Sequence, residues 1–354
     1  MFATYVHNLD PVVFHVYGKL ALRWYGLAYL MGFIGGFYLL RNLAQRKLWV
    51  LAPEKTADFI AMAALLGVFL GGRLGYILLY SSGGLLAIDP NHWQEAVQHG
   101  PLGVVQIWNY LGMNANWWET MKNDPLMVLR VWEGGMASHG GILGLLVFTW
   151  FYAKKHKVTW TGLGDGLCVV APVGLFFGRM ANFINGELFG RVASGVSWAV
   201  KFPLSLARES EDVQRAAWNT CIQIDPKVAD ANSLDDLISL TRHNPELRQN
   251  LGEFLPSRHP SQIYEGLLEG LLLFAILWWV RTRFPKAPDG LLTGLFFGLY
   301  ALFRIFGEQF REPDAPMVSF LTMGQFFSLF MFIFAAGFLA HAWRGWKKNS
   351  ASAE

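Results

Sequence analysis

Charge and cysteine are both scarce in this sequence. Only 16% of its 354 residues are charged, and its two cysteines are Cys168 and Cys221. Soluble domains carry about 25% charged residues, so the composition excludes an ordinary soluble protein of this size. The two cysteines are predicted to lie at different membrane depths, and neither stands beside a histidine or in a cluster of metal ligands. We therefore expect no disulfide, no cysteine nucleophile and no metal site.

Repeats and nucleic-acid signatures are missing as well. The sequence contains no tandem repeat, no low-complexity tract and no basic stripe interleaved with aromatic residues, so nucleic acid is not an expected partner. Apolar residues are abundant instead. They make up 53% of the chain, with 28 Phe and 15 Trp, and the mean hydropathy is +0.29. This composition is typical of a membrane protein that crosses the bilayer several times.

Seven apolar runs approach the length of a membrane span. A helix needs roughly 20 mostly apolar residues to cross about 30 Å of hydrocarbon. The runs are approximately 20–40, 57–80, 139–153, 163–184, 261–280, 290–307 and 319–342, to within a few residues at each end, and the third is short. They predict an all-α integral membrane protein whose seven transmembrane helices form a single membrane domain over residues 1–354.

Basic residues predict the orientation of these spans, because short cytoplasmic loops carry an excess of lysine and arginine. Basic clusters follow spans one, three, five and seven, all on one side: Arg41, Arg46 and Lys47; Lys154, Lys155 and Lys157; Arg281, Arg283 and Lys286; Arg344, Lys347 and Lys348. The N-terminus is then outside and the C-terminus cytoplasmic. We expect the first run to be retained rather than cleaved as a signal peptide, since its basic cluster follows it.

Two long segments fall on the predicted outer side. Residues 81–135 are rich in tryptophan, which favours an interfacial location. Residues 185–260 form the second outer segment, and within it 205–255 is charged and helix-prone, as in a small head. Both segments are predicted to be extracytoplasmic.

Ionisable residues occur within or beside several predicted spans. Each costs about 2.5–3.5 kcal/mol or more at the bilayer centre, so such residues usually face a cavity or a partner. A single arginine near a span end can instead extend its charge to the interface. As a set they indicate a functional site: Arg23, Arg73, His139, Arg179, Glu187, Glu265, Glu269, Arg304, Glu308 and Arg311.

The densest polar stretch is "GRMANFINGELFGR" at 178–191, at the end of the fourth span. Arginine presents a rigid fork of donors that matches a phosphate, such as a phospholipid headgroup. Asn182 and Asn185, three residues apart, would add neutral donors on one helical face. "SHGG" at 138–141 opens the third span and places His139 in its first turn, where a histidine is suited to proton transfer.

These motifs carry a family resemblance. The chain resembles prolipoprotein diacylglyceryl transferases in "RWYGLAY" at 23–29, "GGRLGY" at 71–76, "HGG" at 139–141, "GRMANFINGELFGR" at 178–191, "HPSQIYEGLLEG" at 259–270 and "YALFRIFGEQFREPD" at 300–314. The resemblance implies a multi-pass enzyme of the bacterial inner membrane. Its implied reaction moves the diacylglyceryl group of phosphatidylglycerol to the thiol of the lipobox cysteine beside a prelipoprotein's signal peptide, releasing glycerol phosphate. No cofactor or metal is implied.

The same resemblance suggests roles for individual residues. His139 and Tyr300 are the candidates for proton transfer, and the sequence does not decide which of them is the base. Arg179 and Arg304 match essential arginines and would neutralise the headgroup phosphate and the leaving group. The remaining phosphatidylglycerol-binding candidates are Tyr25, Asn182, Glu187 and Gly190.

Supporting roles are expected for a further set of polar residues. Glu308 and Arg311, three apart, are expected to form a helix pair that positions Arg304. Arg73 and Glu265 are expected to bridge helices, and Asn185 to assist Asn182.

Two other classes of function are compatible with arginines in a membrane cavity. A transporter of an anionic or phosphorylated solute would show an internal repeat with paired broken helices, whereas the sequence has only a faint echo between "GGRLGY" and "FGRMAN". A structural or chaperone-like membrane partner would tolerate replacement of His139 or Arg179. The transferase accounts for more of the residues than either.

Overall fold

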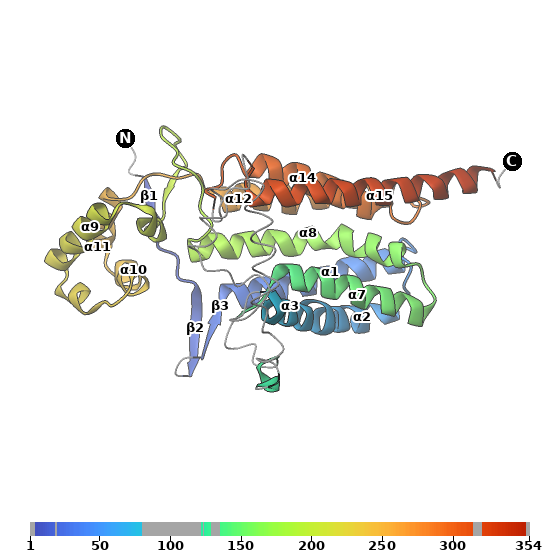
Figure 1. Ribbon diagram of the computed structural model, residues 1–354, viewed down its shortest axis with the longest axis horizontal. Helices are drawn as coiled ribbons and strands as arrows, with labels where there is room; N and C mark the ends of the chain where they lie inside the picture. Colours follow the sequence, from blue (N-terminus) through green and yellow to red (C-terminus); the bar gives the residue numbers. More distant parts are fainter. Residues whose placement is uncertain are drawn as a thin grey trace. The chain divides into compact units, whose positions relative to one another are not determined.

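The computed structural model describes residues 4–17, 20–79, 122, 124–128, 135–313 and 321–351. The described chain is mostly helical (Figure 1). It divides into two compact units. The first comprises Met1–Gly32, Ala171–Ile276 and Leu299–Asp314, and the second comprises Phe33–Val170, Leu277–Gly298 and Ala315–Glu354. Nearly all of the predicted outer segment 81–135 lies outside the described residues.

Long apolar helices dominate the described chain. Five are long and apolar enough to cross a membrane: α1 (Trp24–Gln45), the run Pro53–Leu78, α8 (Trp160–Asn185), the run Ser261–Arg283, and Gly324–Lys347 within α15 (Met323–Ala351). The other two expected spans fall in helices α7 (Ser138–His156) and α14 (Leu291–Gly307). The helical membrane class is confirmed. Seven crossings and their orientation stay a prediction.

Two of the long runs are built from several helical pieces. The first contains η1 (Pro53–Lys55), α2 (Thr56–Met62), the π-helical η2 (Ala63–Leu70) and α3 (Gly71–Leu79). The second contains α12 (Ser261–Glu265), the π-helical η7 (Gly266–Leu272) and α13 (Leu273–Arg283). Wide turns of this kind occur often at functional sites, which makes the second run notable because it carries two glutamates.

The first unit also contains short strands that the sequence patterns did not predict. Strand β1 (Tyr5–Val6) pairs in parallel with β4 (Val200–Lys201), and β2 (Val12–Tyr17) pairs antiparallel with β3 (Leu20–Arg23). The first span was expected to begin at about residue 20, to within a few residues. Residues 20–23 belong to a hairpin, and the helix begins only at Trp24.

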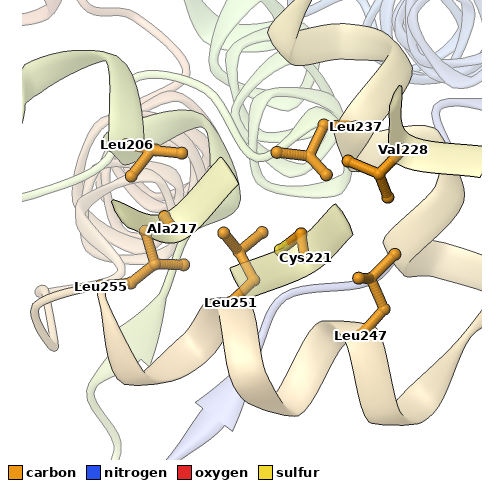
Figure 2. Packing of buried hydrophobic residues seen from close by; sticks show 8 residues of the cluster. All are labelled: Leu206, Ala217, Cys221, Val228, Leu237, Leu247, Leu251 and Leu255. Atoms are coloured by element: carbon orange, nitrogen blue, oxygen red, sulfur yellow. The ribbon is translucent and has the colours of Figure 1, made fainter. Parts of the chain in front are cut away.

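Residues 203–255 of the first unit pack around their own apolar core. The segment contains η5 (Pro203–Arg208), α9 (Glu211–Ile224), η6 (Pro226–Asp230), α10 (Leu234–His243) and α11 (Pro245–Glu253). Figure 2 shows the buried side chains that these elements contribute: Leu206, Ala217, Cys221, Val228, Leu237, Leu247, Leu251 and Leu255. Side-chain caps begin two of the helices, since Ser233 accepts from the Asp236 amide and Asn244 from the Leu247 amide, as expected for Ser and Asn at N-caps.

In the second unit, glycines bring α7 against η2 and α3, which lie beside it in Figure 1. A Cβ added at Gly71 would lie 2.7 Å from the Gly140 carbonyl oxygen and 2.8 Å from the Gly144 Cα. Only small residues permit backbones to approach so closely. The glycines of "GGRLGY" are thus explained by helix packing.

Candidate active site

The buried charges of the first unit meet where α8, the α12–η7 segment and α14 approach one another. Glu265 and Glu269 are four residues apart and so lie on one helical face. Each is followed by a glycine, and these glycines contact α8. A Cβ at Gly266 would lie 3.3 Å from the Arg179 Cβ, and one at Gly270 would lie 2.6 Å from the Phe176 Cβ. The "EGLLEG" sequence therefore brings both carboxylates close to Arg179.

Arg179 uses both ends of its guanidinium on these carboxylates. Its Nη1 lies 2.9 Å from Glu265 Oε2, and its Nη2 donates to Glu269 Oε2 at 2.9 Å. A planar guanidinium held at two points is fixed in orientation. The arginine is thus preorganised before any ligand arrives.

Arg304 joins the same carboxylates from α14. Its Nη1 donates to Glu265 Oε1 at 2.9 Å and lies 3.8 Å from Glu269 Oε1, while its Nη2 contacts Glu308. Arg311 completes the group, with its Nη1 3.1 Å from Glu265 Oε2. Glu265 is therefore bonded by three arginines and links helices α8 and α14. We call these six residues the arginine–carboxylate cluster: Arg179, Glu265, Glu269, Arg304, Glu308 and Arg311.

Exposure divides this cluster into an inner and an outer part. The side chains of Arg179 and Arg304 are 15% and 14% exposed, whereas those of Glu265 and Glu269 are 1% and 0% exposed. Buried charges are tolerated when opposite charges and hydrogen bonds compensate them. Three arginines face three glutamates, so the charges of the cluster balance. The two arginines are the members through which an anion would gain access.

A second group of contacts extends the site along α8. Asn182, one turn after Arg179, is buried and donates to Glu187 Oε1 at 2.8 Å. The Tyr25 hydroxyl contacts both of them, donating to Glu187 and accepting from Asn182. This trio brings the start of α1 to the end of α8. The resemblance had placed all three residues in the lipid site, but their mutual contacts were not predicted.

A tight turn after α8 holds Glu187 in place. Gly186 adopts φ +72°, a left-handed conformation that glycine takes without strain. The Glu187 carbonyl then accepts from Gln262 Nε2 at 2.6 Å. Farther along, a Cβ at Gly190 would overlap the carbonyl oxygens of His259 and Phe310. Gly190 is thus a point of close backbone packing between three segments.

His7, directly after strand β1, packs against this turn. The His7 ring stacks on Phe202 with centroids 5.5 Å apart and meets Phe183 edge-on at the same distance. The ring also lies close to Gly186, since a Cβ added there would be 3.1 Å from His7 Nδ1. Burial lowers the pKa of His7 to about 4, so the ring is neutral at physiological pH.

The expected pair between Glu308 and Arg311 on one helix was wrong. Helix α14 ends at Gly307, so neither residue continues it. Glu308 contacts Arg304 directly, four residues back, and Arg311 bonds Glu265. Asn185 ends α8, and its Oδ1 is buried without a hydrogen-bond partner among the described residues.

Of the remaining predicted residues, Tyr300 belongs to the first unit, whereas His139 and Arg73 belong to the second. Tyr300 lies on α14 one turn before Arg304 and interacts electrostatically with Glu269 and Arg179. In the second unit, His139 is exposed in the first turn of α7, with its ring 5.2 Å from that of Phe327. Arg73 donates there to the carbonyls of Met127 and Gly135. The catalytic roles of His139 and Tyr300 stay predictions.

Glu269 is the residue whose role the sequence reasoning missed. It was counted as an ionisable group at membrane depth but given no function. Its spacing of four residues from Glu265, with a glycine after each, is the signal that would have assigned both carboxylates to one site. Within the described residues, no group of three or more His, Cys, Asp or Glu is placed to hold a metal ion.

Long apolar helices define a helical membrane protein, and a buried arginine–carboxylate cluster is its candidate site. The family model for prolipoprotein diacylglyceryl transferase matches residues 11–341. Among similar proteins, the phosphatidylglycerol–prolipoprotein diacylglyceryl transferase of Rhizobium meliloti is 36% identical, covering 95% of this chain and 92% of the relative. Those of Rhodospirillum rubrum and Bdellovibrio bacteriovorus are each 34% identical, covering 94% and 93% of this chain and 92% and 91% of the relatives. The chain belongs to the prolipoprotein diacylglyceryl transferase family.

Proposed function

We propose that this protein transfers the diacylglyceryl group of phosphatidylglycerol to the thiol of a prolipoprotein cysteine. Membership of the family and the names of its relatives support this reaction and do not favour the transporter alternative. The structural observation that supports it best is the arrangement of Arg179 and Arg304. Both are partly exposed and are held by the same buried carboxylates, as a site for a lipid phosphodiester requires.

The proposed setting is the bacterial inner membrane. The chain crosses it seven times, with the N-terminus outside and residues 81–135 and 185–260 on the outer side. A signal peptide anchors the prolipoprotein there and presents its lipobox cysteine to the outer leaflet, where phosphatidylglycerol is available. Basic clusters after alternate helices support this orientation.

The reaction is a displacement at carbon. The cysteine sulfur forms a bond to the carbon of the diacylglyceryl group that carries the phosphate. The bond from that carbon to the phosphate oxygen breaks. Glycerol phosphate leaves with the electron pair, and the thiol proton passes to a base. A free cysteine has a pKa of about 8.5, so a base within reach raises the share of the reactive thiolate near neutral pH. His139 and Tyr300 are the proposed candidates for that role.

The two arginines stabilise the charge that develops on the leaving phosphate. Their guanidinium groups remain charged at any physiological pH, and a fixed donor costs no reorganisation at the moment of reaction. Glu265 and Glu269 supply that fixation by holding Arg179 at two points. Tyr25 and Asn182 form the adjoining wall and are the neutral groups that would meet ester or phosphate oxygens of the lipid, while Glu187 holds them in place.

The test uses the purified protein in detergent with phosphatidylglycerol and a lipobox peptide. We expect the peptide to gain the mass of one diacylglyceryl group and glycerol phosphate to appear. A peptide with Cys→Ala should show neither product, because the nucleophile is missing. Absence of both products with the cysteine peptide, in a preparation shown to be folded, would contradict the proposed function.

A further inference from the structure

Glu269 has an acceptor atom that the arginine–carboxylate cluster does not use. Its Oε2 accepts from Arg179 at 2.9 Å, whereas its Oε1 is buried without a hydrogen-bond partner among the residues that the structure describes. Arg304 Nη1 lies 3.8 Å from Oε1, too far for a hydrogen bond. By contrast, both oxygens of Glu265 accept hydrogen bonds from arginines.

A buried ionised acceptor without a partner is costly and uncommon, so it calls for an explanation. The side chain is 0% exposed and lies in the π-helical η7, the kind of wide turn often found at functional sites. A carboxylate oxygen accepts hydrogen bonds and repels phosphate. The group that fits beside Arg179 and Arg304 is therefore a hydrogen-bond donor carried by a ligand whose phosphate binds these arginines.

The proposed reaction identifies which ligand group meets this requirement. Displacement at carbon brings the thiol in from the side opposite the leaving oxygen, so groups beside the phosphate-binding arginines face the leaving group. The leaving group of phosphatidylglycerol is a glycerol phosphate with two free hydroxyls. We propose that Glu269 Oε1 accepts a hydrogen bond from a hydroxyl of the headgroup glycerol and so helps to select phosphatidylglycerol. This assignment rests on the proposed function.

The experiment changes the lipid and the residue together. Transfer to the lipobox peptide is measured with phosphatidylglycerol and with phosphatidylpropanol, whose headgroup has the same three carbons but no hydroxyl. For the wild-type protein we expect kcat/KM to be about 10-fold or more higher with phosphatidylglycerol, as the loss of a hydrogen bond to a charged acceptor implies. In Glu269→Gln this ratio should fall several-fold towards one.

Glu308→Gln is the matched control, because Glu308 also contacts Arg304 but has no unpartnered buried oxygen. It should lower transfer from both lipids alike and leave their ratio unchanged. Equal loss with both lipids in Glu269→Gln would show that Glu269 only holds Arg179, and would overturn the proposal. Equal use of both lipids by the wild-type protein would overturn it too, without needing a variant. Failure of the proposed function is distinct, since the wild-type protein would then transfer from neither lipid.

Discussion

Glu265 is the carboxylate on which the arginine–carboxylate cluster depends most. It lies 2.9 Å from Arg179 Nη1, 2.9 Å from Arg304 Nη1 and 3.1 Å from Arg311 Nη1, with its side chain 1% exposed. Glu265→Gln keeps the shape of the side chain but replaces one charged oxygen with an NH₂ group. That NH₂ group would then face the N–H donors of an arginine. Three guanidinium groups, of which that of Arg311 is buried, would then lose a shared counter-charge.

The expected loss follows from these contacts. Removing one partner of a buried ion pair costs about 3–5 kcal/mol, and Glu265 serves three partners, so the upper part of this range applies. Glu308→Gln is the comparison, because Glu308 contacts one cluster arginine, Arg304. Both variants are measured in the same detergent. Glu265→Gln should have a lower midpoint of thermal unfolding and a lower rate of lipid transfer than Glu308→Gln. We expect transfer to fall at least 100-fold, roughly the rate equivalent of 3 kcal/mol. Equal midpoints and equal rates for the two variants would refute the account of the cluster.

Three further predictions concern the first unit. Gly190→Ala should lower both the midpoint of thermal unfolding and the rate of lipid transfer, because overpacking at this position costs about 1–3 kcal/mol. Gly178→Ala is the control and should change neither quantity, since a Cβ at Gly178 meets nothing within 4 Å. The neutral His7, with a folded-state pKa of about 4 against 6.5 when unfolded, should make stability fall as pH drops from about 7 to 4, by about 3 kcal/mol in total. His7→Phe should flatten that dependence, and an unchanged pH profile would contradict the assignment. Burial leaves Cys221 0% exposed and raises its pKa to about 11, so a thiol reagent should label it only after unfolding; rapid labelling of the folded protein would refute this.

The helices could be predicted from the sequence because apolar length is a local property. Each expected run overlaps a helix in the structure. The basic residues and glycines near the runs could also be identified directly from the sequence. The boundaries were less accessible. Helix α1 begins only at Trp24 because the residues before it pair in the β2–β3 hairpin. Helix α14 ends at Gly307, so Glu308 and Arg311 do not share a helix as expected.

The partners of the site could not be read from any single stretch. Arg179 bonds Glu269 across 90 positions, and Tyr25 contacts Glu187 across 162. Such pairs depend on which helix faces pack together, and the sequence supplied only the residue types. Family resemblance supplied the set of residues, and the structure supplied their connections. The spacing of Glu265 and Glu269 was the local clue to the shared carboxylate face.

The most direct test of the central claim compares Arg179→Ala and Arg304→Ala with Arg215→Ala, an exposed arginine of α9. Each purified variant, shown to be folded, is given phosphatidylglycerol and lipobox peptide, and lipidated peptide and glycerol phosphate are counted together. We expect the wild-type protein and Arg215→Ala to form the two products in equal amounts, and the two cluster variants to form neither. Transfer at the wild-type rate by Arg179→Ala and Arg304→Ala would show that the arginine–carboxylate cluster is not the site of reaction.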